Sequence, residues 1–505
     1  MTKHMNNKFY LTTTLPYVNA EPHIGFALEI IQADVIARYH KLLGEEIIFN
    51  TGTDEHGLKI YRKAEELGVD PQKYCDEYAA KFDALKQALN LSYTHFIRTT
   101  DEHHIKAAQV FWLRCEKNGD IYKKNYKVKY CVGCELEKTD SELVDDKCPV
   151  HPNLNIELIE EENYFFKFSK FQKPLLNLYE SNPEFVVPAH RQHEIKNFVE
   201  RGLEDFSISR LKAKMPWGIP VPNDPDHVMY VWFDALINYI STLGWPEDEN
   251  NFYNFWPGVQ VAGKDNLRQQ SAMWQAMLLS AGLPTSKQIF IHGFITSEGQ
   301  KMSKSLGNVV EPYKIVDKYG TDATRYFLLG GLPSYEDGDF SVERFEDFYT
   351  AHLVNGVGNL TSRILSMLEK YSNSKMPEYK DEDLQHQEKV WGDFWLKYKK
   401  YLGEYNFFEV VDLINHFVSR LDELISSEKP WEKVKNGEDI SILLVELALG
   451  LRDLGIALQP IIPNSAQKIL NSFGIENITL DKNCAILKPG TEIKKGEILF
   501  PRLEK

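Results

Sequence analysis

The sequence predicts an α/β fold with a parallel sheet, interrupted by an insertion and followed by an α-helical bundle. Three observations carry this prediction. A strand–helix–strand pattern opens the chain, a cysteine-containing, β-leaning stretch breaks it, and helical periodicity dominates after residue 351. With 505 residues, the chain has room for about three to four domains.

Residues 1–119 carry the alternating pattern of a parallel sheet. Residues 9–14 are rich in β-forming side chains, and apolar residues then recur at helical spacing up to Leu42. The apolar run 47–49 completes a βαβ unit, which predicts a Rossmann-type sheet with right-handed crossovers. The pattern resumes over residues 226–299, so we expect the two segments to form one catalytic domain.

Three further segments complete the expected organisation. An insertion occupies residues 120–225, between the two halves of the catalytic domain. Residues 300–350 carry a polar loop with two lysines and connect that domain to the last one. Residues 351–505 have the apolar spacing of a helical bundle, in which the low-apolar stretch 372–387 is predicted to be a loop.

Composition excludes several classes of protein. The chain is 43% apolar, enough to bury several cores. No run of about 18 apolar residues occurs, so we expect no membrane span, and the polar start lacks a signal-peptide core. Six cysteines at uneven spacing favour a reducing compartment and therefore a cytoplasmic enzyme. The net charge of −15 still allows RNA binding through a local basic patch.

The first chemical feature is Pro22-His23-Ile24-Gly25-Phe26, at the start of the first predicted helix. A helix N-terminus presents unpaired backbone N–H groups and a positive dipole end, so it favours anions. Gly25 would let a nucleotide lie against the backbone, and His23 can donate a hydrogen bond to phosphate. Taken alone, a His-x-Gly at a helix start is more often structural than catalytic.

The second feature is Lys301-Met302-Ser303-Lys304-Ser305, a polar loop that follows a late predicted strand. Two lysines there could neutralise the charge that develops on a leaving pyrophosphate. Most such lysine pairs, however, belong to solvated loops without a chemical role. This loop gains its significance only from its partner at the start of the first helix.

Together, the two loops resemble the paired motifs of the class I aminoacyl-tRNA synthetases. The resemblance implies that ATP binds with Mg²⁺ and that His23, Gly25, Lys301 and Lys304 take part in catalysis. One position departs from the family pattern, because the first motif usually ends in a second histidine and this chain has Phe26.

The insertion carries a candidate metal site. Cys131 and Cys134 form C-x2-C, and Cys148 and His151 follow as C-x2-H. Three sulfurs and one imidazole at this spacing are typical of a tetrahedral zinc knuckle, whereas chance cysteines in a small β subdomain are the alternative. Four protein ligands leave no open coordination position, so we expect one structural Zn²⁺ per chain.

The insertion is only about a hundred residues long, which looks too short for the editing domain of the leucyl, isoleucyl and valyl enzymes. A short insertion with a knuckle resembles that of the methionyl-tRNA synthetases. Further matches to this family lie along most of the chain: Leu15-Pro16-Tyr17, Gly52-Thr53-Asp54-Glu55-His56-Gly57, Trp217-Gly218-Ile219-Pro220-Val221-Pro222, Tyr230-Val231-Trp232-Phe233-Asp234-Ala235, Gly263-Lys264-Asp265 and His292-Gly293.

The resemblance implies a set of substrate contacts. Asp54 would pair with the amino group of L-methionine, and Asp265 would bind the ribose of ATP. The methionine side chain would be enclosed by Leu15, Tyr17, Trp232, Ala235 and Tyr239. The ATP site would be lined by His23, Gly25, Glu29, Gly263, Asp265, His292, Gly293 and Lys304. Without the surrounding motifs, Trp232 and Tyr239 would be interpreted as core residues.

Two further departures lie near this expected pocket. The family often has an aromatic residue followed by a histidine beside the methionine pocket, where this chain has Gln269 and Gln270. Leu236 replaces a proline that is seen in some relatives. Both changes affect the wall of the pocket rather than the nucleotide loops.

The helical bundle resembles the family's anticodon-binding domain. Asn359 and Arg363 would then hydrogen-bond to anticodon bases, and Trp431 would provide a stacking surface, as is usual for single-stranded RNA. In isolation, a Pro-Trp pair at a helix start is usually a packing feature. Because the sequence stops soon after the bundle, without the dimerising domain that some relatives carry, we expect a monomer.

The resemblance implies a two-step reaction, in which methionyl-adenylate forms from methionine and ATP and the methionyl group then passes to initiator or elongator methionine tRNA. Two alternatives stay open. The chain could be another class I synthetase or a related ATP-dependent ligase with a different amino-acid pocket. It could also be a non-catalytic RNA-binding paralogue, although the intact lysine loop and Asp54 argue against that.

Overall fold

A computed structural model describes residues 7–134, 136–138, 140–302, 308–476, 478–480 and 487–503. Its centre is a six-stranded parallel sheet in the order β3-β2-β1-β12-β13-β7. This arrangement confirms the predicted Rossmann-type α/β fold. Among the described residues, no helix combines the length and the apolar composition needed to cross a membrane.

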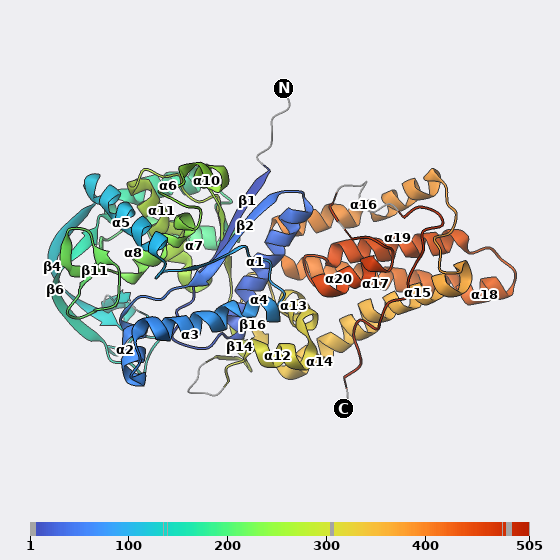
Figure 1. The fold of residues 1–505 in the computed structure, drawn as a ribbon, viewed down its shortest axis with the longest axis horizontal. Helices are drawn as coiled ribbons and strands as arrows, with labels where there is room; N and C mark the ends of the chain where they lie inside the picture. The colour runs from blue at the N-terminus through green and yellow to red at the C-terminus, as the bar shows by residue number, and fades with distance from the viewer. Residues whose placement is uncertain are drawn as a thin grey trace, which may run out of the picture.

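The first half of the sheet and its crossover helices come from the start of the chain. The elements are β1 (Lys8–Thr13), α1 (Ile24–Leu42), β2 (Glu46–Thr53), α2 (Leu58–Leu67), α3 (Pro71–Asp83), α4 (Leu85–Ala88), β3 (His95–Arg98) and α5 (Glu102–Lys117). Helix α1 is buried along most of its length because it lies between the sheet and the C-terminal helices (Figure 1). A helix in that position must be apolar on more than one face.

The inserted region contains two small antiparallel sheets and two helices. Its elements are β4 (Ile121–Cys131), β5 (Leu136–Lys138), the 3₁₀ turns η1 (Asp140–Glu142) and η2 (Phe168–Phe171), β6 (Glu157–Phe166), α6 (Gln172–Ser181), β7 (Val186–Val187), α7 (Ala189–Glu200), β8 (Phe206–Ser207), β9 (Ser209–Leu211), β10 (Pro220–Val221) and β11 (Asp224–Met229). Strand β7 pairs with β13 and is an edge of the main sheet. The segment 120–225 therefore also contributes to the parallel sheet.

The second half of the sheet follows. It consists of α8 (Val231–Ala235), α9 (Asn238–Ser241), α10 (Glu249–Phe255), β12 (Val259–Gly263), the 3₁₀ turn η3 (Lys264–Asn266), the π-helix η4 (Gln269–Met273), α11 (Trp274–Ser280) and β13 (Gln288–His292). A three-stranded sheet and two helices lead out of this region: β14 (Ile295–Ser297), β15 (Gln300–Lys301), α12 (Pro312–Tyr319), α13 (Thr321–Gly330) and β16 (Gly338–Phe340).

The remainder is helical, as predicted, and extends away from the sheet (Figure 1). It contains α14 (Val342–Phe348), the π-helical segment η6 (Tyr349–Gly358), α15 (Asn359–Ser372), α16 (Asp381–Gly403), α17 (Phe407–Glu428), α18 (Pro430–Lys435), α19 (Ser441–Leu458) and α20 (Pro463–Asn471). The predicted loop 372–387 was wrong in its second half, since α16 starts at Asp381. Acidic residues are favoured in a first helical turn, and the low apolar content concealed this start.

Candidate active site and metal centre

The candidate active site lies where the sheet order reverses. Strand β1 has β2 on one side and β12, more than 200 residues later, on the other. In parallel sheets such a switch point opens a crevice at the carboxyl ends of the strands. Thr14, Asp54, Gly263 and His292 all lie at the carboxyl ends of these strands or directly after them. The topology therefore brings four separate motifs to one edge.

His23 is the residue that caps the N-terminus of α1. Its backbone is extended, and its Nδ1 accepts a hydrogen bond of 3.1 Å from the Gly25 N–H. The ring reaches solvent at the mouth of the crevice, but the protein surrounds it closely enough that burial lowers the pKa of His23. Because Nδ1 is the acceptor, the neutral ring carries its proton on Nε2. That N–H is the group that can donate to a phosphate oxygen.

Gly25 shows that the two loops meet. A Cβ at this position would lie 3.0 Å from His23 Nδ1, closer than ordinary packing allows, and 3.9 Å from Met302 Cε. The Ile24 N–H also donates to the Val310 carbonyl at 2.9 Å. The first helix start thus contacts the chain on both sides of the lysine loop. The backbone of Lys301 belongs to β15, whereas Lys304 lies outside the described residues.

Glu29 and His292 form a buried pair across the crevice. His292 Nε2 lies 3.0 Å from Glu29 Oε2, and both residues are at most 5% exposed. The Thr14 N–H and hydroxyl donate to Glu29 Oε1 at 2.8 and 2.5 Å. Burial acts to lower the pKa of His292, but the hydrogen bond to Glu29 and the charge of that carboxylate outweigh it, so the pKa is raised. The pair ties the ends of β1 and β13 to α1.

Gly263, Asp265 and Gly293 complete the nucleotide side of the crevice. A Cβ on Gly263 would lie 2.9 Å from Asp265 Oδ1 and 3.6 Å from His292 Cε1, so these residues share one wall. A Cβ on Gly293 would collide with the Glu336 backbone at 2.2 Å. Asp265 is exposed on η3 and can reach a ligand. Glycines are needed here because the chain passes so close to its neighbours.

Asp54 and Tyr17 are fixed side by side at the ends of β2 and β1. The Asp54 N–H donates to the Pro16 carbonyl at 3.0 Å, and the Val18 N–H donates to the Asp54 carbonyl at 3.3 Å. Asp54 is only 2% exposed. This backbone pairing places a buried carboxylate next to the ring of Tyr17.

Aromatic rings form the wall beside Asp54. Tyr17 and Trp232 meet edge to face, with ring centroids 6.3 Å apart. Leu15 is partly buried, and Ala235 and Tyr239 are buried on the helical segment that follows Trp232. Burial is the main cause of the raised pKa of Tyr239; the Gln270 hydrogen bond opposes it, and the charges of Glu29 and Asp54 add to it. The hydroxyl of Tyr239 therefore lies near both carboxylates of the crevice.

Gln270 occupies the back of this wall. Its Nε2 donates to the Tyr239 hydroxyl at 2.7 Å, and its Oε1 accepts from Gln260 Nε2 at 3.1 Å. Both glutamines of the Gln269-Gln270 pair belong to the π-helix η4 and are at most 5% exposed. Thus an amide replaces the family's histidine and holds the tyrosine hydroxyl in place.

Three residues to which the sequence assigns no role, His56, His104 and Asp234, form a buried bridge beside these motifs. His56 Nδ1 lies 2.7 Å from Asp234 Oδ2, and His104 Nε2 lies 2.9 Å from Asp234 Oδ1. Burial favours the neutral acid, but the two histidines outweigh it and lower the pKa of Asp234. These contacts connect the segment after Asp54 to the segment after Trp232. In the sequence, His56 and Asp234 lie two residues beyond the predicted pocket residues Asp54 and Trp232, whereas His104 has no such neighbour.

The predicted metal ligands form one cluster. The Sγ atoms of Cys131, Cys134 and Cys148 and the Nδ1 of His151 all lie within 4.8 Å of one another. Cys134 Sγ is 3.5 Å from Cys148 Sγ and 3.2 Å from His151 Nδ1. Ligands at about 2.0–2.3 Å from a tetrahedral zinc ion would be separated by similar distances. The donor set and its spacing therefore fit one Zn²⁺.

The cluster requires a glycine at position 133. A Cβ at that position would lie 2.5 Å from His151 Cγ, so only glycine lets the imidazole approach the thiols. Tyr130 and Val132, on either side of Cys131, pack in a small apolar cluster with Tyr17 and Trp232. The knuckle (residues 131–151) is therefore in contact with the aromatic wall of the crevice.

The predicted anticodon residues lie on the helical bundle. Asn359 begins α15 and is exposed, and Arg363 on the same helix forms an ion pair with Asp422 on α17. Trp431 is 47% exposed on α18, at the end of the molecule farthest from β4 and β6 (Figure 1). The exposed part of this indole is accessible to a ligand.

Comparison with known proteins agrees with the fold. Residues 9–156 and 139–365 match a family model described as tRNA synthetases class I (M). The parallel sheet, the crevice at its switch point and this match define the chain as an enzyme of the class I aminoacyl-tRNA synthetases, which are ligases.

Individual relatives indicate to which family within this class the chain belongs. The methionine–tRNA ligase of Thermotoga maritima is 39% identical and covers 98% of this chain and 80% of its own length. That of Rickettsia bellii is 39% identical over 99% of this chain and 100% of its own. The structure of Mycobacterium tuberculosis methionyl-tRNA synthetase in complex with methionyl-adenylate has a TM-score of 0.90, with 35% identity over 98% of this chain and 100% of that one. The chain belongs to the methionine–tRNA ligase family.

Proposed function

We propose that this enzyme activates L-methionine with ATP and transfers the methionyl group to the 3′-terminal adenosine of methionine tRNA, initiator and elongator alike. The observation that carries the proposal is the convergence of Asp54, Glu29–His292 and the His23–Gly25 loop at one crevice. AMP and pyrophosphate are the other products. Positioning and charge stabilisation can supply the acceleration without a side-chain nucleophile.

ATP is assigned to the nucleotide side of the crevice. His23 Nε2 donates to a phosphate oxygen, and the backbone at Gly25, which carries no side chain, accepts the phosphate chain. Asp265 binds the ribose, beside the wall formed by Gly263, His292 and Gly293. Glu29 positions the ring of His292 on the nucleotide side of the crevice. Lys301 and Lys304 neutralise the pyrophosphate as it leaves, and Mg²⁺ accompanies ATP.

Methionine is assigned to the aromatic side. Its ammonium group pairs with Asp54, which leaves the carboxylate directed at the α-phosphate for in-line attack. Its thioether lies among Leu15, Tyr17, Trp232, Ala235 and Tyr239. Aromatic contacts to sulfur contribute roughly 0.3–1.5 kcal/mol each. The Gln270 amide holds the Tyr239 hydroxyl at the back of this pocket.

Zinc has a structural role in the proposal. Cys131, Cys134, Cys148 and His151 hold one ion, and no position remains open for substrate. The bound ion would supply cross-linking of the knuckle, which supports the wall that contains Tyr17 and Trp232.

The RNA half of the proposal rests on the exposure of Trp431. Trp431 stacks on an anticodon base, and Asn359 and Arg363 contact base edges. The proposed division is a catalytic domain in residues 1–119 and 226–299, a connective insertion with the zinc knuckle in 120–225, the lysine loop and a stem-contact region in 300–350 and an anticodon-binding domain in 351–505. We further propose a monomer that acts in the cytoplasm.

Pyrophosphate exchange into ATP, measured with each of the twenty amino acids, tests the function directly. Exchange should depend on methionine and on no other amino acid at equal concentration. A different preferred amino acid would identify another synthetase or ligase, and no exchange at all would support a non-catalytic paralogue. Charging of methionine tRNA on the same preparation tests the second step.

A further inference from the structure

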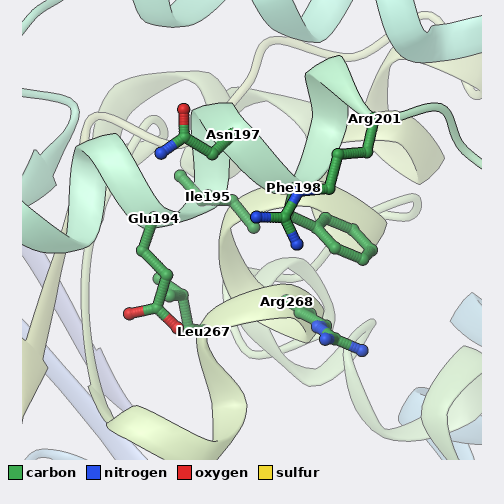
Figure 2. A pocket seen from close by; sticks show the side chains of 7 residues that line it. All are labelled: Glu194, Ile195, Asn197, Phe198, Arg201, Leu267 and Arg268. Atoms are coloured by element: carbon green, nitrogen blue, oxygen red, sulfur yellow. The ribbon is translucent and has the colours of Figure 1, made fainter. Parts of the chain in front are cut away.

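A cavity of about 190 Å³ lies between helix α7 and the segment that follows β12 (Figure 2). It is lined by Glu194, Ile195, Asn197, Phe198, Arg201, Leu267 and Arg268. None of these residues belongs to the ATP or methionine sites assigned above. The volume is several times the roughly 30 Å³ that one water molecule occupies, so a group of several heavy atoms fits.

One face of α7 provides most of the lining. Glu194, Asn197, Phe198 and Arg201 recur at spacings of three and four residues, which places them in one row along the helix. Arg268 approaches from the opposite side, and its guanidinium carbon lies 4.5 Å from the centre of the Phe198 ring. Figure 2 shows the side chains of Arg201 and Arg268 extending toward this ring from the two walls.

The lining of the cavity contains two arginines, Arg201 and Arg268, and one carboxylate, Glu194. The carboxylate of Glu194 is paired with Arg191 at 2.5 Å. Arg268 makes a long contact of 3.4 Å to Glu142, and its side chain remains 58% exposed. Within the described part of the chain, the side chain of Arg201 has neither an ion pair nor a hydrogen bond. The guanidinium group of Arg201 and the exposed part of the Arg268 side chain are therefore accessible to a ligand.

These groups match one kind of ligand chemistry. Arginine forms paired hydrogen bonds with phosphate oxygens, and an aromatic ring or a guanidinium plane stacks on an unpaired base. The Asn197 amide can both donate to and accept from a base edge. An acidic peptide would use the arginines but would gain little from the ring and the amide.

The position of the cavity indicates where such a nucleotide comes from. Arg268 follows the proposed ribose ligand Asp265 by three residues, which is less than one helical turn. The cavity is therefore close along the chain to the nucleotide side of the crevice. We propose that the cavity formed by α7 and residues 267–268 binds an unpaired nucleotide of the tRNA acceptor end during transfer. This inference rests on the proposed function.

Arg201→Ala and Arg268→Ala test it, with two assays on each preparation. Each variant should lower kcat/KM for tRNA by about 10- to 100-fold, the usual effect of losing a hydrogen bond to a charged group. Methionine-dependent pyrophosphate exchange without tRNA should stay at the wild-type rate, which also shows that the variant is folded. For single-stranded contacts, each lost phosphate partner should reduce the salt dependence of tRNA binding by about 0.7 in the log–log slope.

Two further variants act as matched controls. Lys196→Ala removes one positive charge from α7, but this lysine pairs with Glu180 and does not line the cavity, so charging should not change. Arg201→Lys keeps the charge and loses the planar fork, so it should restore the salt slope without restoring full charging.

A binding measurement completes the test. Wild-type enzyme should bind a stem–loop RNA with an unpaired 3′ overhang more tightly than the same stem with a blunt end, and Arg201→Ala with Arg268→Ala should abolish that preference. Equal charging by wild type and the double variant, or parallel loss of exchange and charging, overturns the inference. Absence of methionine-dependent exchange in the wild type contradicts the proposed function instead. In that case, the preference for the overhang RNA still tests whether the cavity binds an unpaired nucleotide.

Discussion

The knuckle and the crevice are both clusters of chemically reactive side chains, but they are assembled in opposite ways. All four knuckle ligands lie within residues 131–151. In the crevice, Glu29 and His292 are in contact although 263 residues separate them. The knuckle can be predicted from spacing because a short chain can close on itself, whereas the crevice depends on the whole sheet.

The difference extends to what holds each cluster together. Three thiols and an imidazole gain little from one another without a shared cation, so we expect the knuckle to depend on a bound metal. The crevice balances its own charges, because the Glu29 carboxylate faces a buried histidine and two donors of Thr14. Metal removal should therefore affect the first region, and loss of the fold or of single charges should affect the second.

The largest expected effect is the loss of zinc in Cys148→Ser. Structural zinc in small domains binds with about 10–16 kcal/mol, and its loss unfolds the segment that it joins. We expect about one zinc per chain in the wild type, none in the variant, and rapid proteolysis within the knuckle. Metal analysis and limited proteolysis provide the measurement. Cys115→Ala is the control, since Cys115 is buried outside the cluster. Fully active protein without zinc would contradict the assignment.

The second largest effect is expected for Lys304→Ala, which tests the crevice without affecting the knuckle. The ammonium group of Lys304 is proposed to stabilise negative charge that develops only as pyrophosphate leaves. Its removal should therefore slow adenylate formation by about 10²- to 10³-fold, with a much smaller change in methionine affinity. Pre-steady-state measurement of adenylate formation separates the two quantities. Lys314→Ala, an exposed lysine that pairs with Glu311, should leave both unchanged. A normal rate in Lys304→Ala would assign the loop a structural role.

Glu29→Gln tests the buried pair through its pH dependence. The raised pKa of His292 means that its charged form stabilises the fold fully below the unfolded pKa of about 6.5, and this contribution is lost as pH rises through the raised value. Below the unfolded pKa, Glu29→Gln should be less stable than the wild type by about 1.5–3 kcal/mol. This difference should shrink as pH rises through the raised pKa of His292. Denaturant melts at several pH values measure it.

Glu45→Gln is the matched control for this pair. Glu45 also faces a histidine, His40, but burial lowers the pKa of His40 despite that carboxylate. Because Glu45 itself raises the pKa of His40, Glu45→Gln should lower that pKa further and lose stability in the same direction of pH, but by less, since His40 and Glu45 are more exposed than His292 and Glu29. A pH-dependent loss in Glu29→Gln no larger than that in Glu45→Gln would show that Glu29 has no special coupling to His292.

The smallest effect is expected at Trp431, outside both regions. Trp431→Ala should forfeit roughly 1–3 kcal/mol of base stacking, which weakens tRNA recognition about 5- to 150-fold while pyrophosphate exchange is preserved. Val434→Ala changes another exposed apolar residue of α18 and should affect neither activity. Equal losses in exchange and charging, with a lower melting temperature, would instead indicate a packing role.

Residues near the predicted motifs show where sequence reasoning stopped. The role of Gln270 could be suspected from its place after Asp265, but its hydrogen bond to Tyr239 could not. The Asp234 bridge between His56 and His104 joins residues 178 and 130 positions from it, and no periodicity indicates such a contact. The cavity at Arg201 and Arg268 gave no sequence signal, because its two walls come from segments more than 60 residues apart.

The sequence alone determined the elements and the local chemistry: the strand–helix alternation, the helix start at His23 and the knuckle ligands. These features depend on neighbouring residues, whose spacing sets which side chains share a face. Only the tertiary structure decided that Met302 meets Gly25, that Glu29 pairs with His292 and that the knuckle supports the wall at Trp232. Such contacts follow from the order of the strands in the sheet, and that order is selected by the packing of the whole domain.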